Sequence, residues 1–155
     1  MKKLHFHFED ISPIGLPDNI NLWLAQVISA EHFVVDNLNF IFCSDNYLLE
    51  INNTYLNHDY FTDIITFDLS EIEEQISGDL FISLDRVTEN AQKFSCLFEN
   101  ELLRVMVHGI LHLCGYKDKS ETDQKLIRSM EDFYLSLYDS MNVPRGTFML
   151  SYKDK

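Results

Sequence analysis

Two histidines four residues apart stand shortly before a glycine, in the stretch HGILHLCGYKD at residues 108–118. On an α-helix, positions i and i+4 lie only about 40° apart around the axis, so His108 and His112 project from one face. Gly115 permits the left-handed conformation that ends a helix and turns the chain back, which brings Asp118 toward the same point. The spacing therefore predicts a helix, a reversal and three converging side chains.

These three side chains have the chemistry of metal ligands. Two imidazoles and a carboxylate, with a fourth position open, form the arrangement of a catalytic zinc ion, which lowers the pKa of a water molecule. The simpler alternative is an apolar helix whose histidines lie at the surface and whose Gly109 only permits close packing. Gly115 and Asp118, at their offsets from His112, favour the metal site and a hydrolase.

Strand-like and helix-like patterns follow one another along the chain. Leu4, Phe6 and Phe8 alternate with polar residues, as in a half-buried strand, whereas apolar residues recur at helical spacing after Ser83. Strands are expected at residues 3–10, 37–45, 62–69 and 78–83, and helices at residues 20–33, 45–56, 83–94, 99–115 and 120–138. This order indicates an α+β fold, in which helices cover a small mixed β-sheet.

The length of the chain indicates one domain over residues 1–155, because 155 residues of which 46% are hydrophobic suffice for one core. Asp18 or Asn19 is expected to cap the first helix. Residues 70–78 are acidic and polar, which favours a flexible hairpin-type connection. The segment 142–155 is expected to be a loose tail.

The composition limits the possible partners and compartments. Twenty-five acidic and twelve basic side chains give a net charge of -13, which argues against a protein that coats nucleic acid, so any RNA contact must be local. The sequence contains no apolar run long enough to predict a membrane span or a signal peptide. The three cysteines, Cys43, Cys96 and Cys114, lack a disulfide or metal spacing and suit a reducing cytoplasm.

The motif at residues 108–118 closely resembles the signature His-Gly-x-Leu-His-Leu-x-Gly-Tyr-Asp-His of the YbeY family, the bacterial endoribonucleases that act in ribosomal RNA maturation. Upstream, INNTYLNHDYFTDIITFDL resembles the family segment Asn-x-x-Tyr-Arg-x-x-Asp-x-Pro-Thr-Asp-Val-Leu-Ser-Phe, and GDLFIS resembles its strand Gly-Asp-Ile-x-Ile-Ser. The matches keep the family's order over about residues 46–131. The combination is far more specific than any one motif.

The resemblance implies a metal-binding helix like that of the zincins and one zinc ion, held by His108, His112 and Asp118. Asp118 stands where the family usually has a third histidine, and a carboxylate is also a zinc ligand. Thr62 and Asp63 resemble family residues near the cleft, where they would position substrate or water. Their alternative role is to cap a strand.

A second departure from the family pattern is Leu56, which stands where the family typically has an arginine. An arginine there could hold a phosphate or stabilise developing charge. Arg104, one helical turn before His108, is the candidate substitute. The alternative for Arg104 is a surface residue paired with Glu101.

The resemblance implies a metal-dependent endoribonuclease for single-stranded RNA, which acts in maturation of the 16S ribosomal RNA 3′ end and in ribosome quality control. Ribosomal RNA precursors and the small ribosomal subunit are the expected partners, and neither DNA nor a membrane is expected. One alternative is a ribosome assembly factor that uses zinc only to hold its fold. A zinc peptidase is disfavoured, because Gly109 stands where such peptidases carry a glutamate.

Overall fold

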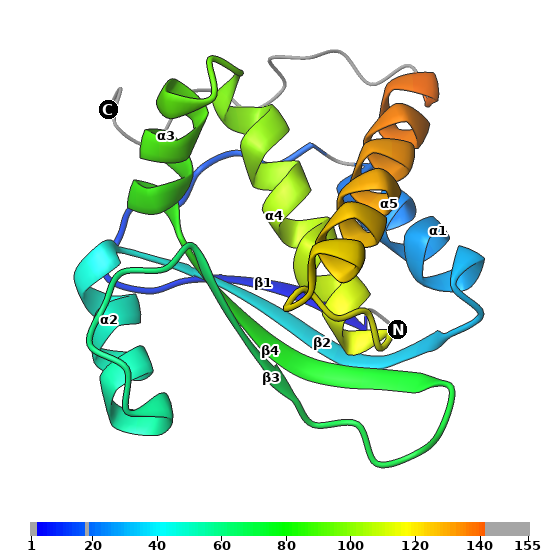
Figure 1. Cartoon of the computed structure of the whole chain (residues 1–155), viewed down its shortest axis with the longest axis horizontal. Coiled ribbons are helices and arrows are strands. Elements are labelled where there is room, and N and C mark those ends of the chain that lie inside the picture. Colours follow the sequence, from blue (N-terminus) through cyan, green and yellow to red (C-terminus); the bar gives the residue numbers. More distant parts are fainter. Residues whose placement is uncertain (1–2, 18, 142–155) are drawn as a thin grey trace.

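The structure is a computed structural model, which describes residues 3–17 and 19–141 (Figure 1). Asp18 and the segment 142–155 lie outside the described residues, so the expectations for a cap at Asp18 and for a loose tail stay predictions. In chain order the elements are β1 (Leu4–Phe8), α1 (Ile20–Ala30), β2 (Val34–Cys43), α2 (Asp45–Leu56), β3 (Ile64–Asp68), β4 (Gln75–Ser83), α3 (Leu84–Lys93), α4 (Phe98–Leu113) and α5 (Glu121–Ser140).

The four strands form one mixed sheet in the order β1-β2-β4-β3. β1 and β2 run parallel, as do β2 and β4, whereas β3 and β4 form an antiparallel hairpin in which Ile64 lies opposite Ile82. Within the described residues the sheet and five helices make a single α+β domain. The predicted fold class is therefore confirmed.

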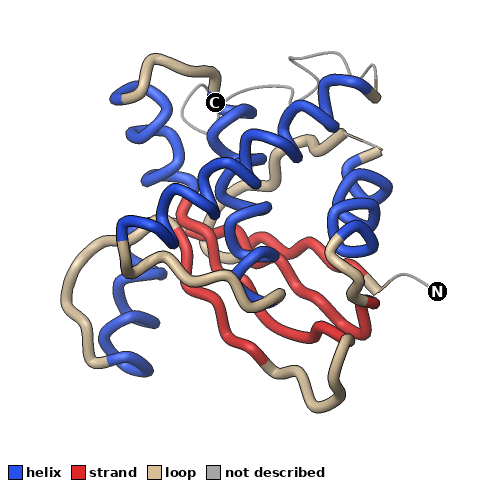
Figure 2. The backbone as a smooth tube through the Cα atoms, turned by 45° about the vertical axis from the view of Figure 1, so that its right-hand side comes forward, coloured by secondary structure: helices blue, strands red, loops and turns tan. Residues whose placement is uncertain are grey.

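Alternate residues of the strands face two different apolar clusters. The larger cluster lies between the sheet and most of the helices, and includes Phe40 and Leu80 from neighbouring strands together with Met106 of α4. The smaller cluster joins α2 to the sheet through Leu48 and Ile65. Figure 2 shows most of the helices on one side of the sheet. This arrangement places α4 in the centre of the molecule, against β3 and β4.

Three element boundaries differ from the predicted ones by three residues, and the others by less. β4 begins at Gln75, because Ser77 and Gly78 pair with β2, so the connection after β3 is shorter than the predicted segment 70–78. β2 likewise begins at Val34. α1 ends at Ala30 because His32 adopts a left-handed conformation, with φ of 66°. Asn19 stands at the N-cap position of α1 but makes no side-chain capping hydrogen bond.

The longest helix, α5, packs one face against α4 and the core. Its buried residues are Ile127, Glu131, Tyr134 and Tyr138, and its N-cap Ser120 accepts a hydrogen bond from the backbone N–H of Asp123. Glu131 is thus a carboxylate on an otherwise aromatic and aliphatic face. Of the helices that the structure describes, none is long and apolar enough to cross a membrane.

Candidate metal centre

The position of α4 depends on Gly109. A Cβ atom at this glycine would lie 2.3 Å from Cδ2 of Leu80 and 2.7 Å from Cδ1 of Ile64, so the helix backbone approaches the sheet too closely for a side chain. Ile110 beside it is fully buried. Close packing between α4 and the sheet therefore explains why residue 109 is a glycine. With Gly109 facing the sheet, the side chain of the adjacent His108 is directed toward the rim of the sheet and is partly exposed.

The chain reverses direction directly after α4, as its glycine predicts. Gly115 has φ of 101°, its N–H donates to the carbonyl of His112 at 3.0 Å, and the N–H of Tyr116 donates to the carbonyl of Leu111 at 3.0 Å. These two bonds form a Schellman motif, which satisfies the last carbonyls of the helix. The reversal leads the chain back to Asp118 beside the helix.

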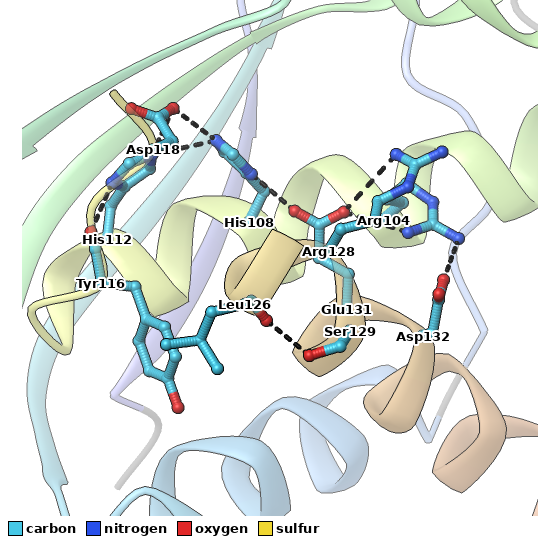
Figure 3. A network of polar contacts seen from close by, with 10 residues as sticks. All are labelled: Arg104, His108, His112, Tyr116, Asp118, Leu126, Arg128, Ser129, Glu131 and Asp132. Carbon is cyan, nitrogen blue, oxygen red and sulfur yellow. Dashed lines mark hydrogen bonds and ion pairs between the residues drawn. The ribbon is translucent and has the colours of Figure 1, made fainter. Parts of the chain in front are cut away.

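The three predicted ligand groups converge on one point (Figure 3). Nε2 of His112 lies 2.9 Å from Nε2 of His108 and 3.1 Å from Oδ2 of Asp118, and the remaining distance, from Nε2 of His108 to Oδ2 of Asp118, is 3.5 Å. Ligand atoms of a tetrahedral zinc site stand about 3.3 Å apart, given bonds of about 2.0–2.2 Å. The triangle therefore has the size that one such ion requires.

The other ring nitrogens determine the protonation of this triangle. Nδ1 of His112 lies 2.9 Å from the carbonyl oxygen of Tyr116, and Nδ1 of His108 lies 2.6 Å from Oε2 of Glu131. Both partners are acceptors, so both Nδ1 atoms carry a proton, and a neutral imidazole then has a lone pair at Nε2. Two such lone pairs and a carboxylate oxygen repel one another without a cation between them. The donor set therefore fits a divalent metal ion.

Glu131 is the functional residue that the sequence interpretation missed. Its side chain is only 4% exposed, and besides His108 it accepts a hydrogen bond from Nη1 of Arg104 at 3.0 Å. Burial alone lowers the pKa of His108, but the hydrogen bond and charge of Glu131 outweigh burial and raise it. A carboxylate behind a ligand histidine fixes the tautomer and increases the basicity of the ligand nitrogen. The detectable signal was an acidic residue on the buried stripe of α5.

A second, partly buried carboxylate holds the loop that carries Asp118. Glu31, which follows α1, accepts a hydrogen bond from Oη of Tyr116 at 2.8 Å and another from Oη of Tyr134. Burial and the hydrogen bond to Glu31 raise the pKa of Tyr116 to about 12, so its hydroxyl stays a donor at neutral pH. The loop after α4 is thus tied to α1 and α5.

Two cavities meet at the triangle. The larger, of about 760 Å³, is lined by Thr62 and by all three converging side chains, and the smaller, of about 390 Å³, extends between α3, α4 and α5. Asp63, His108 and Asp118 line both cavities. Burial raises the pKa of Asp63. The structure thus brings Thr62 and Asp63 to the same cleft as the triangle, directly before β3.

Comparisons with known proteins agree with this site. The family model for Endoribonuclease YbeY matches residues 9–139. The chain belongs to the YbeY family. It is 55% identical to the Endoribonuclease YbeY of Flavobacterium psychrophilum over 116 residues, which are 75% of this chain and 82% of the relative. It is 46% identical to the Endoribonuclease YbeY of Flavobacterium johnsoniae over 135 residues, which are 87% of this chain and 96% of the relative.

A solved structure supports the YbeY assignment at the level of the fold. The solution structure of TM1509 from Thermotoga maritima matches with a TM-score of 0.61 and 27% identity, and the match covers 88% of this chain and 92% of that one. The predicted family is confirmed, and with it the nuclease class of enzyme that the names of the relatives state.

Leu56, which the resemblance of the motifs places where the YbeY family has an arginine, has an exposed side chain that lines the larger cavity. Arg104 lines only the smaller cavity, and its two terminal nitrogens contact Glu131 at 3.0 Å and Asp132 at 2.7 Å. The predicted alternative partner of Arg104, Glu101, makes no ion pair with it in the described part of the chain. The guanidinium is therefore already engaged by two carboxylates.

Lys119, one residue after Asp118, is the lysine that lines the larger cavity. None of the ion pairs among the described residues involves its ammonium group. Lys119 and Leu56 line the same cavity, and a lysine there has the point charge that suits a phosphate.

Cys114, next to the reversal, packs against the large apolar cluster. Burial raises the pKa of its thiol to about 12, so the sulfur stays protonated and is a poor metal ligand. All three cysteines of this YbeY chain are free.

Proposed function

We propose that this protein cleaves single-stranded RNA by metal-assisted hydrolysis, with one zinc ion held by His108, His112 and Asp118. The observation that carries the proposal is the triangle of two unprotonated imidazole nitrogens and a carboxylate oxygen, all within 3.5 Å of one another. Two nitrogens and one oxygen are a ligand set that zinc accepts, and one position is left for water or substrate. A bound ion there would supply Lewis-acid chemistry at the scissile phosphate.

The chain's own residues supply the positioning. Asp63 lies in both cavities next to the triangle, and its carboxylate can accept a hydrogen bond from the attacking water. Thr62, beside it, brings a hydroxyl to the larger cavity. Lys119 would hold the phosphate in place of the absent arginine, whereas Arg104 would act by holding Glu131 behind His108. We assign Arg104 a positioning role on this basis.

The larger cavity also supports a single-stranded substrate. Tyr60 and His58 stack on each other with ring centroids 5.1 Å apart, both side chains are exposed, and both line this cavity. Exposed rings are the surfaces on which unpaired bases stack. With a net charge of -13, the chain cannot attract RNA through its overall field, so such local contacts must supply the binding.

The proposed substrate is a ribosomal RNA precursor, at the 3′ end of the 16S RNA, bound with the small ribosomal subunit in the cytoplasm. The names of the relatives support an RNA substrate, and the family resemblance of the motifs supports the ribosomal one. Three free cysteines fit a reducing compartment. Ribosome quality control is the process in which the cleavage would act.

One structural observation favours a second candidate. Leu56 presents an apolar side chain to the cavity at the position where a phosphate-binding arginine is typical of the family. A non-catalytic assembly factor, which keeps zinc for its fold and binds the small subunit, accounts for that substitution. A zinc peptidase has no such support, because the packing at Gly109 leaves no room for the glutamate that peptidases carry there.

A cleavage assay separates these candidates. Zinc-loaded protein and the His112→Ala variant are incubated with unstructured RNA and with a casein-like peptide pool. The proposal predicts RNA cleavage by the wild type alone, with identical circular dichroism spectra for the two proteins. Binding to small subunits without RNA cleavage would favour the assembly factor, and peptide cleavage would overturn the choice of RNA.

A further inference from the structure

The smaller cavity contains chemistry that the proposed cleavage does not use. Its volume of about 390 Å³ lies within the range of about 300–1,000 Å³ typical of small-ligand sites. Away from the triangle it is lined by Asn90 of α3, Phe94 at the end of α3, and Glu101 of α4. The triangle stands between this cavity and the larger one, so an RNA strand across the metal site would reach both.

Glu101 is the unusual member of this lining. The residue is only 6% exposed, and no hydrogen bond or ion pair among the described residues engages its carboxylate. Burial, followed by the charge of Asp63, raises the pKa of Glu101 to about 7. A buried carboxyl without a partner is costly, so the cavity offers an acceptor that a ligand can satisfy.

The surroundings exclude two classes of ligand. A second metal ion lacks a site, because the triangle is the one group of three potential ligands that converges within the described residues. A phosphate would meet Glu101, Asp63 and Glu131. Of the two arginines in the lining, Arg104 is engaged by carboxylates, and Arg128 is 59% exposed and lies 3.8 Å from Glu131. The ligand must therefore present N–H donors rather than negative charge.

The rim adds a flat apolar surface. Phe94 lines the cavity and is 55% exposed; Nζ of Lys93 lies 5.7 Å from its ring centroid, so a base would stack on the part of the ring that Lys93 leaves open. Asn90 brings an amide that can donate to a carbonyl oxygen beside it. A stacking ring, a carboxylate and an amide together match the face and the hydrogen-bonding edge of a nucleobase.

We propose that the smaller cavity binds a guanine base next to the scissile phosphate, with Phe94 stacked on its face and Glu101 reading its edge. Guanine is the RNA base that presents two adjacent donors, N1–H and the 2-amino group, and a carboxylate accepts both at once. Asn90 donates to O6 of the same base. The inference deepens the proposed RNA cleavage, because it names the base preference of that site.

The binding half of the test needs no metal and no cleavage. Guanosine 5′-monophosphate and inosine 5′-monophosphate, which lacks the 2-amino group, are titrated into chelator-treated full-length protein by calorimetry. The wild type is expected to bind the guanosine nucleotide about tenfold more tightly, as befits one well-placed bidentate contact. Glu101→Gln is expected to abolish this ratio, and Phe94→Leu to weaken both nucleotides equally.

Matched controls separate recognition from structure. Glu50→Gln removes an exposed carboxylate on α2, and Phe133→Leu removes a ring that is 59% exposed on α5, outside the cavity. Both are expected to leave the nucleotide ratio unchanged. Glu101 also lies in the first turn of α4, where a carboxylate favours the helix. That role alone would alter thermal stability in Glu101→Gln but not the ratio of the two nucleotides.

The cleavage half compares oligonucleotides that differ only in the base on either side of the cut, using zinc-loaded wild type and Glu101→Gln. A guanine preference that disappears in Glu101→Gln supports the proposal. Equal binding of the two nucleotides, or cleavage with a guanine preference that survives Glu101→Gln, overturns it while RNA cleavage stands. Guanine-selective binding without cleavage of any RNA would instead overturn the proposed function and leave the pocket supported.

Discussion

Oε2 of Glu131 accepts a hydrogen bond from Nδ1 of His108 at 2.6 Å, across the contact between α5 and α4. This bond leaves the lone pair of Nε2 free to point at His112 and Asp118. A residue 23 positions along the chain thus sets the chemical state of a proposed metal ligand.

Replacing Glu131 with glutamine should weaken metal binding. The amide retains the size of the side chain but supplies no charge behind His108, and loss of such a partner typically lowers metal affinity about 10- to 100-fold. A competition titration with a zinc chelator measures this effect. Asp132→Asn is the control, because Asp132 contacts the same Arg104 but is 61% exposed. Equal zinc affinity for wild type and Glu131→Gln would show that Glu131 does not act through His108.

Substitutions of Arg104 and Lys119 should have different effects: the first should lower the stability of the fold, and the second should slow RNA cleavage. Arg104→Ala removes the nearer of the two arginines that contact the buried Glu131 and leaves Arg128 at 3.8 Å, so the free energy of unfolding should fall by about 2 kcal/mol. Lys119→Ala alters an exposed residue and should change it by less than about 0.5 kcal/mol, yet it should slow RNA cleavage, most strongly at low salt. Urea titrations and cleavage rates measure both. Wild-type stability of Arg104→Ala would contradict the role of Arg104 in holding Glu131. A wild-type rate of RNA cleavage by Lys119→Ala would contradict the role of Lys119 in holding the phosphate.

Gly115→Ala should affect the fold and the metal site together. With φ of 101°, an alanine here is strained by about 1–2 kcal/mol, and relief of that strain moves the loop that presents Asp118. Thermal unfolding and zinc titration should therefore both show a loss. Lys117→Ala, an exposed change in the same loop, serves as the control. If Gly115→Ala lost stability but bound zinc as tightly as the control, the reversal would not position Asp118.

The stability of the metal-free protein should depend on Glu101 near neutral pH. Burial raises the pKa of Glu101 from 4.5 to about 7; Asp63 and Glu131 act in the same direction, whereas Arg104 and Arg128 oppose the shift. Because the folded pKa is the higher one, the stabilising contribution is complete below about pH 4.5 and is lost as the pH rises through 7.

Glu101→Gln has no proton to lose, so it should gain about 2 kcal/mol relative to wild type between about pH 5 and pH 8. Urea unfolding at the two pH values measures the difference, and Glu50→Gln, which removes an exposed carboxylate, should show none. A constant difference between Glu101→Gln and wild type across this range would mean that Glu101 titrates as an ordinary surface carboxylate.

The parts of the site that the sequence predicted are local. The i, i+4 spacing of His108 and His112 and the left-handed Gly115 are properties of a few consecutive residues, and the chain follows them. The mixed sheet was also predictable, because strand periodicity is local. The start of β4 was not, since Gln75 and Ser77 are polar and belong to the strand only because β2 lies beside them.

The supporting residues could not be predicted in the same way. Glu131 and Glu31 act through contacts with other elements, and Glu101 through the cavity that it lines; all three follow from the packing of the helices. One clue was present: Glu131 shares a helical face with Ile127, Tyr134 and Tyr138, where an acidic residue needs a buried partner. The partner itself is visible only in three dimensions.

Metal content tests the central claim most directly. Plasma mass spectrometry measures the zinc content of untagged wild type, His112→Ala and Asp118→Ala, each variant lacking one proposed ligand. Circular dichroism confirms that the variants are folded. The account predicts about one zinc ion per wild-type chain and strong depletion in both folded variants. Wild-type protein without bound metal, or full zinc retention in Asp118→Ala, would contradict the proposed centre.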